Sequence, residues 1–356
     1  MTLGDSSTEV FCARFDPEDR YIACGYGDGC VRIYNLETGK LSYTLSGGLF
    51  AMDHEMPITC LRWRPQSKQL KTMNVLVTAQ ADGSLKHWHS TSGKCLHARN
   101  DQPDNHLYCI DFSPDGSLLA TAGRDAHIRL YDETTKSLAM TLKEKGELPG
   151  HSNRIFGVKF NHVQQSMLVS GGWDNTLQIY DIRERGPVAS IYGPHVCGDS
   201  LDFRNDGYTL LVGSYRQDDA LQLFDLRMNK CTRTYEWDGL DGGQNFIDKE
   251  NQLFAGRKDD LLEEDPESEH MQKFRPKSPP MLYSAMFNRT AKQDLIFAGG
   301  AGRNQVRVFD YESGSLVCVV SDMPRSVLCM DMAYTSTAFA FGSADSCIRI
   351  MDVQSS

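Results

Sequence analysis

The stretch GHSNRIFGVKFNHVQQSMLVSGGWDNTLQIYD, from Gly150 to Asp181, decides the fold of this chain. It begins with Gly-His, ends with Tyr-Asp, and holds a Trp-Asp pair in a short turn between two apolar runs. A His, a Ser and two Asp residues could form a catalytic site, and they could equally be the polar residues of a structural repeat. Whether the pattern recurs in the chain distinguishes these two interpretations.

The ending LQIYD recurs in six further places along the chain. The matching endings are VRIYN (Asn35), LKHWH (His89), IRLYD (Asp132), LQLFD (Asp225), VRVFD (Asp310) and IRIMD (Asp352). Subtracting successive positions, Asp181 included, gives gaps of 54, 43, 49, 44, 85 and 42 residues. Most of these gaps are close to the ~40–45 residues of a four-stranded propeller blade. Upstream of the endings lie an alternating run that closes on an aromatic residue, such as ITCLRW, and an apolar run that closes on a turn, such as LLATAGRDA. The hydrophobic pattern of these runs has a period of two residues, which predicts β-strands.

On these repeats the chain resembles the WD-repeat β-propellers. The resemblance implies an all-β fold, a seven-bladed propeller of four-stranded antiparallel blades with the last blade incomplete. We expect one domain over residues 9–353, and its blades at 9–48, 56–100, 106–143, 150–192, 195–236, 281–321 and 326–353. The 85-residue gap leaves an eighth blade as the alternative, although no strand with an aromatic-Asp ending follows NQLFAGRKDD.

Two places depart from the repeat. Residues 236–280 contain twelve acidic and six basic side chains, a net charge of −6 out of −10 for the whole chain. We expect 237–280 to be an acidic inserted loop between blades five and six, which either docks a basic partner or is a solvated loop. Blade seven has sequence for three strands only. Either residues 2–8 pair with it, or its edge stays open to a strand of another protein.

The polar residues of the opening stretch have a structural explanation in the family. The resemblance places His151, Ser170, Asp174 and Tyr180 in a hydrogen-bond network within the blade. The chain has no GxSxG, HExxH or GxxxxGK[ST] motif, so we expect no enzyme activity and no cofactor. His87 and His89 lie on one face of a strand and could bind a metal, but a third ligand is missing nearby.

Composition narrows the partners and the compartment. A net charge of −10 argues against a broad nucleic-acid surface, and no apolar run approaches the ~18–20 residues that span a bilayer. The chain begins without the pattern of a secretion signal, and its eleven cysteines show no paired CxxC spacing. We therefore expect protein partners, no nucleic acid, no membrane insertion, and a cytoplasmic location. A cytoskeletal, ciliary or nuclear location remains the alternative.

In the family, two positions of each blade point to the top face of the propeller. The first lies four residues before the aromatic that ends the first strand, and the second precedes the turn Asp. Carried over, the first set is Phe11, Thr59, Tyr108, Phe156, Asp199, Tyr283 and Leu328, and the second is Gly27, Ala81, Arg124, Trp173, Tyr215, Ala301 and Ala344. Large side chains at the second position occur in blades three to five only.

These positions predict a partner-binding patch on the top face. Its residues are Phe11, Tyr108, Arg124, Arg154, Phe156, Trp173, Tyr215 and Tyr283. Trp, Tyr and Arg dominate the energetics of protein interfaces. The alternative for Trp173 is that it packs on a neighbouring loop. The predicted function is a non-enzymatic protein–protein interaction scaffold, a subunit or adaptor of a larger assembly.

A second surface gives an alternative function. IYDIR, which ends at Arg183, and LFDLR, which ends at Arg227, match an aromatic-Asp-x-Arg pattern in two consecutive blades. The pattern resembles the motif by which substrate receptors of cullin-type ubiquitin ligases bind their adaptor. In this alternative, Arg183 and Arg227 on the bottom face would bind a carboxylate of the adaptor.

Overall fold

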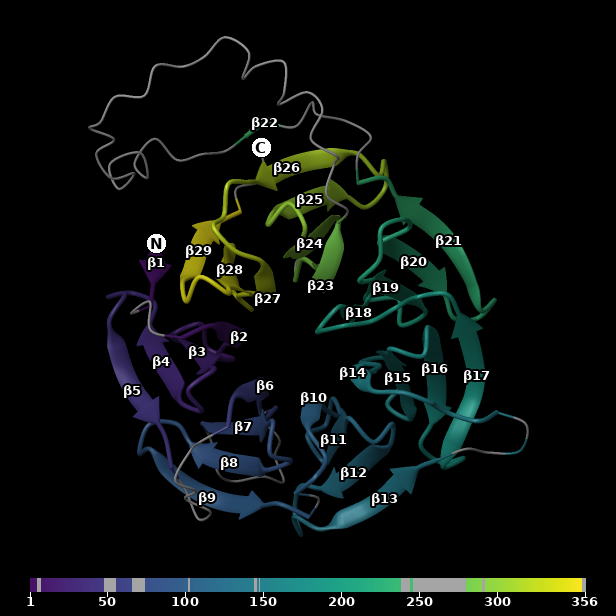
Figure 1. Ribbon diagram of the computed structural model, residues 1–356, viewed down its shortest axis with the longest axis horizontal. Coiled ribbons are helices and arrows are strands. Elements are labelled where there is room, and N and C mark those ends of the chain that lie inside the picture. Colours follow the sequence, from purple (N-terminus) through teal and green to yellow (C-terminus); the bar gives the residue numbers. More distant parts are fainter. Residues whose placement is uncertain are drawn as a thin grey trace.

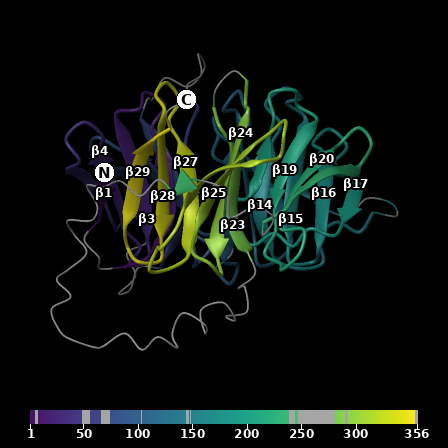
Figure 2. The ribbon, with the colours of Figure 1, turned by 90° about the horizontal axis from the view of Figure 1, so that it is seen from above.

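The fold is described from a computed structural model. It describes residues 1–4, 8–47, 56–65, 74–101, 103–143, 146, 148–237, 244–245, 280–289 and 292–353. These residues form seven β-sheets and no helix. Figure 1 shows the sheets as blades that follow one another around a ring in chain order, and Figure 2 shows the ring edge-on. The predicted all-β, seven-bladed propeller is confirmed.

Within each blade the strands pair antiparallel from the axis outward. Blade one consists of β2 (Val10–Phe15), β3 (Tyr21–Tyr26), β4 (Val31–Asn35) and β5 (Leu41–Leu45), and blade two of β6 (Ile58–Trp63), β7 (Val75–Gln80), β8 (Leu85–His89) and β9 (Lys94–Arg99). Blade three consists of β10 (Leu107–Phe112), β11 (Leu118–Gly123), β12 (Ile128–Asp132) and β13 (Leu138–Leu142), and blade four of β14 (Ile155–Phe160), β15 (Met167–Gly172), β16 (Thr176–Asp181) and β17 (Gly186–Tyr192). Blade five consists of β18 (Leu201–Phe203), β19 (Thr209–Gly213), β20 (Leu221–Asp225) and β21 (Lys230–Tyr235). Blade six consists of β23 (Met281–Phe287), β24 (Leu295–Ala301), β25 (Val306–Asp310) and β26 (Leu316–Val320). Blade seven consists of β27 (Val327–Met332), β28 (Ala338–Ser343), β29 (Ile348–Asp352) and β1 (Thr2–Leu3).

The second strand of a blade is buried on both sides because blades pack face to face. All six residues of β7 are buried. Val75 and Val77 pack in an apolar cluster with blade three, whereas Leu76 packs in the cluster with blade one. Side chains of a strand alternate between its two faces, so consecutive apolar residues serve two cores in turn. This explains why these strands read as continuous apolar runs.

Blade seven is completed by the N-terminus. Thr2 of β1 pairs with Arg349, and Leu3 pairs with Ile348. The amino group of Met1 donates to the carbonyl of Ile350 at 2.8 Å, and the Leu3 side chain is buried. Of the two alternatives for this edge, pairing by the N-terminal residues is therefore the one that forms, over two residues.

In five of the blades, the turns between the second and third strands share one backbone feature. The residue after the turn Asp has a positive φ, which places it in the left-handed region that favours glycine. The residues there, with φ in parentheses, are Gly29 (79°), Gly83 (84°), Ala126 (61°), Asn175 (58°) and Ser346 (70°). The turn is thus kept in blades three and seven even where the sequence has no glycine or asparagine.

The acidic insertion predicted at 237–280 lies almost entirely outside the described residues. Its described parts are Trp237, Pro280 and the two-residue strand β22 (Gln244–Asn245), which pairs parallel with Cys318 and Val319 of β26. Trp237 is buried beside Phe309 of blade six, with ring centroids 5.9 Å apart. The described residues contain seven sheets and no eighth.

Candidate functional site: the top face of the propeller

We define the top face as the one on which the chain enters the first strand of each blade and on which the second and third strands are joined. The turn Asp residues and all eight residues of the predicted patch lie in or beside these segments. The bottom face carries the turns between first and second strands and between third and fourth strands. Arg183 and Arg227 lie in bottom-face turns, after β16 and β20.

The polar residues of blade four form one hydrogen-bonded chain. His151 Nδ1 lies 2.7 Å from Asp174 Oδ2, and His151 Nε2 lies 2.6 Å from Ser170 Oγ. Because a carboxylate only accepts, Nδ1 carries the proton, and Nε2 then accepts from the Ser170 hydroxyl. Burial alone would raise the pKa of Asp174, but the hydrogen bonds from His151, the Ser152 amide and Thr176 outweigh it and lower that pKa. Tyr180 is buried and hydrogen-bonded with Ser170.

Other blades satisfy the turn Asp in a different way. In blades one, three and seven its carboxylate pairs with an Arg four residues later, on the third strand. These pairs are Asp28–Arg32 at 2.7 Å, Asp125–Arg129 at 2.5 Å and Asp345–Arg349 at 2.6 Å. The Arg thus takes the place that His151 holds in blade four, which explains how the turn survives where the Gly-His start is missing.

Aromatic side chains of blades three to five stack into one row, which we call the aromatic ladder: His106, Tyr108, Phe156, Trp173 and His195. Between successive rings the centroid distances are 6.4, 4.4, 5.1 and 6.1 Å. The last three pairs are stacked, with interplanar angles of 9°, 27° and 17°. The ladder therefore joins Tyr108, Phe156 and Trp173 of the predicted patch.

Trp173 is held firmly and yet remains 37% exposed. Its indole Nε1 donates to Cys197 Sγ at 2.8 Å, and the Arg154 guanidinium lies over its ring at 5.0 Å from the centroid. Burial raises the pKa of the Cys197 thiol to about 11, so the sulfur stays protonated at neutral pH. Trp173 does pack on a neighbouring segment, and it also presents an edge to solvent.

Tyr215 and Tyr283 continue the aromatic surface towards blade six. Their ring centroids are 5.1 Å apart with an interplanar angle of 41°. The Tyr215 amide donates to the carbonyl of His195 at 2.7 Å, which ties the pair to the end of the aromatic ladder. Burial raises the pKa of Tyr283 and, more weakly, lowers that of His195. The Tyr283 and His195 side chains are therefore uncharged at neutral pH.

The remaining predicted patch residues differ in position. Phe11 is 38% exposed on blade one beside Gly27, and it forms no ring contact with the aromatic ladder. Arg124 is exposed at the turn of blade three, and its amide donates to the carbonyl of His106 at 2.9 Å. Sequence reasoning missed His195 and Cys197. The signal for His195 was the GPH triplet that opens blade five where blade four opens with GH.

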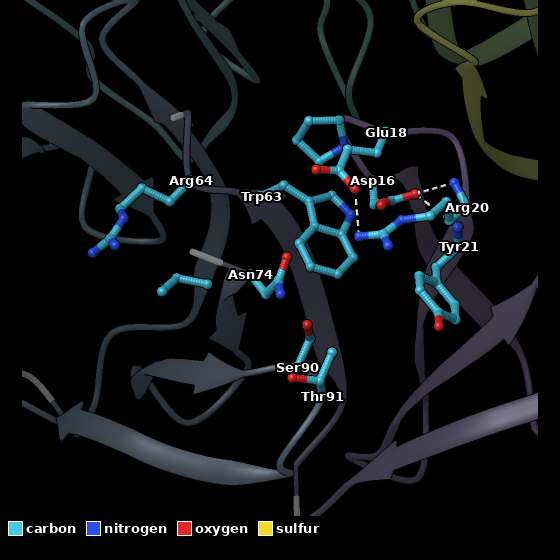
Figure 3. A pocket seen from close by; sticks show the side chains of 11 residues that line it. Asp16, Glu18, Arg20, Tyr21, Trp63, Arg64, Asn74, Ser90 and Thr91 are labelled. Atoms are coloured by element: carbon cyan, nitrogen blue, oxygen red, sulfur yellow. Dashed lines mark hydrogen bonds and ion pairs between the residues drawn. The ribbon is translucent and has the colours of Figure 1, made fainter. Parts of the chain in front are cut away.

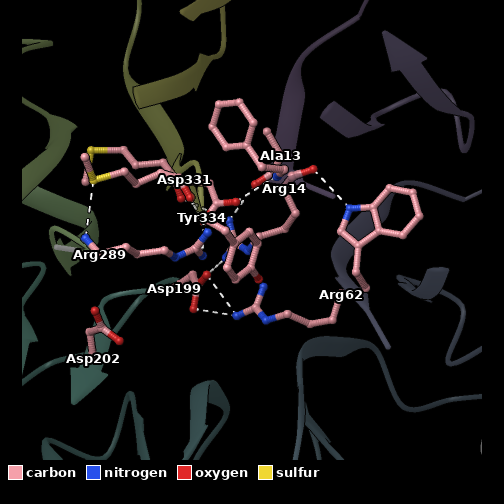
Figure 4. A network of polar contacts seen from close by, with 12 residues as sticks. Ala13, Arg14, Arg62, Asp199, Asp202, Arg289, Asp331 and Tyr334 are labelled. Atoms are coloured by element: carbon pink, nitrogen blue, oxygen red, sulfur yellow. Dashed lines mark hydrogen bonds and ion pairs between the residues drawn. The ribbon is translucent and has the colours of Figure 1, made fainter. Parts of the chain in front are cut away.

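The axis of the ring carries a charged network that the sequence did not suggest. Six blades place a charged residue one position before the aromatic or Met that ends the first strand: Arg14, Arg62, Asp111, Lys159, Asp202 and Asp331. Asp199, one of the residues carried over to the top face, contacts Arg14, and both of its carboxylate oxygens lie 2.9 Å from Arg62 Nη2. Figure 4 shows Arg14, Arg62 and Asp199 pointing towards one another from three different blades.

Three of these aspartates also join neighbouring blades. The carboxylate of each accepts from the amide of the aromatic that ends the first strand of the next blade. The contacts are Asp111 with Phe160 at 2.8 Å, Asp202 with Phe287 at 3.0 Å and Asp331 with Phe15 at 2.8 Å. The network therefore works as a set of contacts between blades, and its charges are largely compensated.

On the bottom face, Arg183 and Arg227 have the same conformation. Each folds back onto the Asp of its own motif, with Nη2–Oδ2 distances of 2.5 Å for Asp181 and 2.6 Å for Asp225. The Arg side chains are 72% and 62% exposed. The Arg227 guanidinium also lies over the Tyr208 ring at 3.6 Å. Both arginines are accessible, but each is already paired with a carboxylate.

A pocket lies on the bottom face between blades one and two, and Figure 3 shows its lining around Trp63. Its polar groups bind one another: Asp16 accepts from the amides of Arg20 and Tyr21 at 2.7 Å, and Arg20 pairs with Glu18.

His89, which could have joined His87 at a metal, lies with its Nδ1 2.7 Å from Ser92 Oγ instead. Within the described ranges no group of three or more His, Cys, Asp or Glu could hold a metal ion. No helix long and apolar enough to cross a membrane occurs in that part either.

Comparison with known proteins agrees with the geometry. The family model of the WD domain, G-beta repeat, matches residues 1–35, 40–89, 93–132 and 142–181. This chain belongs to the WD-repeat β-propeller family. The matched segments include the first three strands of each of the first four blades, and blades five to seven repeat the same strand order.

Curated relatives of this WD-repeat propeller are distant. A LEC14B homolog of Prunus armeniaca is 23% identical over 66% of this chain and 51% of its own length. The target of rapamycin complex subunit wat1 of Schizosaccharomyces pombe is 29% identical over 44% of the chain and 47% of its own. The ribosome biogenesis protein WDR12 homolog of Anopheles gambiae is 24% identical over 62% of the chain and 51% of its own. The chain thus spans about half the length of these relatives.

Proposed function

We propose that this propeller is a non-enzymatic scaffold, a subunit or adaptor of a larger protein assembly, and that it binds a partner with the aromatic ladder of its top face. The observation that carries the proposal is the row of five aromatic rings across three blades, the last four of them stacked, in which Trp173 remains exposed. Stacked rings are rigid and mainly apolar, so a partner can bury them at a small cost in side-chain entropy. Two relatives with similar sequences are named as a complex subunit and a biogenesis factor, which supports an assembly role.

The absence of catalysis is part of this proposal. The triad-like residues of blade four are closed to substrate, because the side chains of His151 and Asp174 are 0% and 3% exposed. Each hydrogen-bonding atom of His151 is engaged inside the blade. A nucleophile must reach its substrate, and Ser170 is fully buried. The residues therefore fit a structural role.

The proposal also concerns partners and compartment. With a net charge of −10, the protein is expected to bind other proteins rather than nucleic acid, and to insert into no membrane. Cys12, Cys24, Cys60, Cys109 and Cys329 are buried thiols, which suits a reducing compartment. We place the protein in the cytoplasm, with the nucleus as the alternative, and cell fractionation distinguishes the two.

Affinity purification with mass spectrometry tests the site. The baits are the wild type, Phe156→Ala/Trp173→Ala, and Arg183→Ala/Arg227→Ala, each first shown to be folded by thermal melting. We expect the aromatic variant to lose partners that the arginine variant keeps. Retention of every partner by the aromatic variant would contradict the top-face proposal.

A second candidate function rests on Arg183 and Arg227, which stand exposed on the bottom face of adjacent blades. In this case the protein is a substrate receptor of a cullin-type ubiquitin ligase. An adaptor carboxylate would have to replace Asp181 and Asp225 at the two guanidinium groups. Loss of a cullin adaptor from the arginine variant alone supports this candidate, and its absence from all three baits opposes it.

A further inference from the structure

Two arginines beside the aromatic ladder, Arg124 and Arg154, form no ion pair with any carboxylate in the described part of the chain. Arg124 is exposed at the turn of blade three, and Arg154 leads into the first strand of blade four. The described residues supply neither of them with an ion pair. This is unusual on the top face, where Arg32, Arg129 and Arg349 each pair with the turn Asp of their own blade.

Backbone contacts fix both arginines to the aromatic ladder. The Arg124 amide donates to the carbonyl of His106 at 2.9 Å, and the Trp173 amide donates to the carbonyl of Arg154 at 2.9 Å. A Cβ on Gly172 would meet the Arg154 carbonyl oxygen at 2.1 Å, so the close approach of the two segments requires glycine there. The backbone of Arg124 thus lies at the His106 end of the ladder, and the Arg154 guanidinium lies over the Trp173 ring.

The nearby carboxylates do not neutralise these charges. Asp125, next to Arg124, pairs with Arg129 at 2.5 Å. Asp174, next to Trp173, is buried and accepts from His151 and Thr176. Burial lowers the pKa of His195, so its ring adds no charge to the other end of the ladder at neutral pH. Among the described residues, an aromatic strip with two cations that no carboxylate pairs is therefore left on a chain whose net charge is −10.

From this arrangement we propose that the aromatic ladder binds an acidic segment of a partner protein, with an apolar or aromatic side chain on the exposed edge of Trp173 and carboxylates on Arg124 and Arg154. The inference rests on the proposed function and adds the chemistry of the partner. Arg binds carboxylates through two parallel hydrogen bonds, which gives geometric specificity as well as attraction. Complementary charge also speeds association and excludes basic competitors.

Selection from a phage-displayed library of random twelve-residue peptides tests this chemistry on the full chain. We expect the recovered peptides to contain Asp and Glu in excess over Lys and Arg, together with a Trp, Phe, Tyr or Leu. The best peptide should bind at least tenfold more weakly when its Asp and Glu are changed to Asn and Gln. Raising the salt from 0.05 to 0.5 M should weaken the acidic peptide and leave its amide form nearly unchanged.

Matched variants locate the effect. Arg124→Glu/Arg154→Glu should lose at least tenfold in affinity for the acidic peptide, and Arg124→Gln/Arg154→Gln should lose less. Arg183→Glu/Arg227→Glu makes the same charge change on the bottom face and should bind like the wild type. Thermal melting of each variant separates a binding defect from a folding defect, and the Gln pair keeps the test valid if the Glu pair does not fold.

Two results would overturn the inference, and they differ in what else they remove. In the first result, the recovered peptides lack acidic residues, bind Arg124→Glu/Arg154→Glu as well as the wild type, and do not bind Trp173→Ala. This result would reject the acidic partner and leave the top-face function in place. Recovery of no peptide that depends on Trp173 would reject both the acidic partner and the ladder as a binding site.

Discussion

Asp199 and Arg62 are 137 residues apart in the chain and bind each other across the axis of the ring. Both carboxylate oxygens of Asp199 lie 2.9 Å from Arg62 Nη2. Arg62 belongs to blade two and Asp199 to blade five, so the contact joins non-adjacent blades (Figure 4). A propeller consists of blades that mainly contact their neighbours. A bond of this kind ties the ring together from the inside.

Asp199→Asn should therefore destabilise the fold by about 1–3 kcal/mol. Arg62 is buried, and the change removes one of its two carboxylate partners and leaves Asp111, whose Oδ1 lies 3.5 Å from Arg62 Nε; partial exposure of Asp199 lets water offset part of the loss. Denaturant titration gives the free energy of unfolding. Asp218→Asn, an exposed carboxylate on the top-face turn of the same blade, serves as the control and should change it little. Equal stability of both variants would mean that the axial contact contributes nothing.

The seam between blades one and seven carries a second clasp besides β1. The Asp19 carboxylate accepts from the Tyr334 amide at 2.8 Å, from the Thr335 amide at 2.5 Å and from the Ser336 amide at 3.2 Å, all in the turn of blade seven. Because β1 pairs over two residues only, we expect Asp19→Ala to lower the unfolding free energy by about 1–2 kcal/mol. The loss should begin in blade seven.

Hydrogen exchange measures where this loss occurs. Amides of β28 and β29 should exchange faster in Asp19→Ala. Asp115→Ala is the matched control, since Asp115 holds the corresponding turn of blade three through Ser113 and Ser117 of the same blade. Exchange that rises evenly over all blades in Asp19→Ala would show that the seam opens only with global unfolding.

Acid should weaken the contact between blades two and three. His87 Nε2 lies 2.9 Å from Glu133 Oε1, and Lys136 and Arg64 also face that carboxylate, while the His97 ring lies 5.6 Å from the His87 ring. Burial lowers the pKa of His87, and Glu133 opposes this only in part. The folded state thus binds the proton less readily than the unfolded chain, whose His pKa is about 6.5. This contribution to stability is present above that value and is lost as the pH falls through the folded pKa.

The measurement is the unfolding free energy between pH 8 and pH 5. His87→Gln keeps a donor for Glu133 and cannot take up a proton, so its stability should fall less steeply with acid than that of the wild type. His89→Gln, on the same strand, should follow the wild-type curve. Parallel curves for His87→Gln and the wild type would remove His87 as the cause.

The fold could be predicted because each blade has its own sequence pattern within a short stretch of the chain. An alternating run, an apolar run and an aromatic-Asp ending are all read within about forty residues, and seven copies reinforce one another. The closure of blade seven could not be decided in the same way, since Thr2 and Leu3 pair with residues 345 or more positions later. Two residues carry no periodicity from which a strand can be inferred.

For the candidate site, the sequence predicted which residues lie on the top face, but not which side chains they contact. Tyr108, Phe156 and Trp173 were placed together from their repeat positions, but His195 and Cys197 lie outside those positions. The repeat position of Asp199 predicted the top face, but it gave no sign of the ion pairs that Asp199 forms with two arginines of other blades. The position of a residue in the repeat determines where its backbone lies in the blade, whereas ion pairs between blades determine the direction of its side chain.

The hydrogen-bonded chain of blade four gives the last prediction. Asp174→Ala leaves His151 Nδ1–H and the Thr176 amide without their acceptor inside the blade, which should cost about 1–3 kcal/mol of unfolding free energy. Asp174→Asn keeps one oxygen acceptor and should lose less. Because Trp173 precedes Asp174 in the same turn, the Ala variant should also weaken binding to the aromatic ladder at temperatures where the rest of the propeller is folded. A wild-type melting temperature for Asp174→Ala would show that the turn of blade four is held by its backbone alone, and that His151 and Ser170 are free for another role.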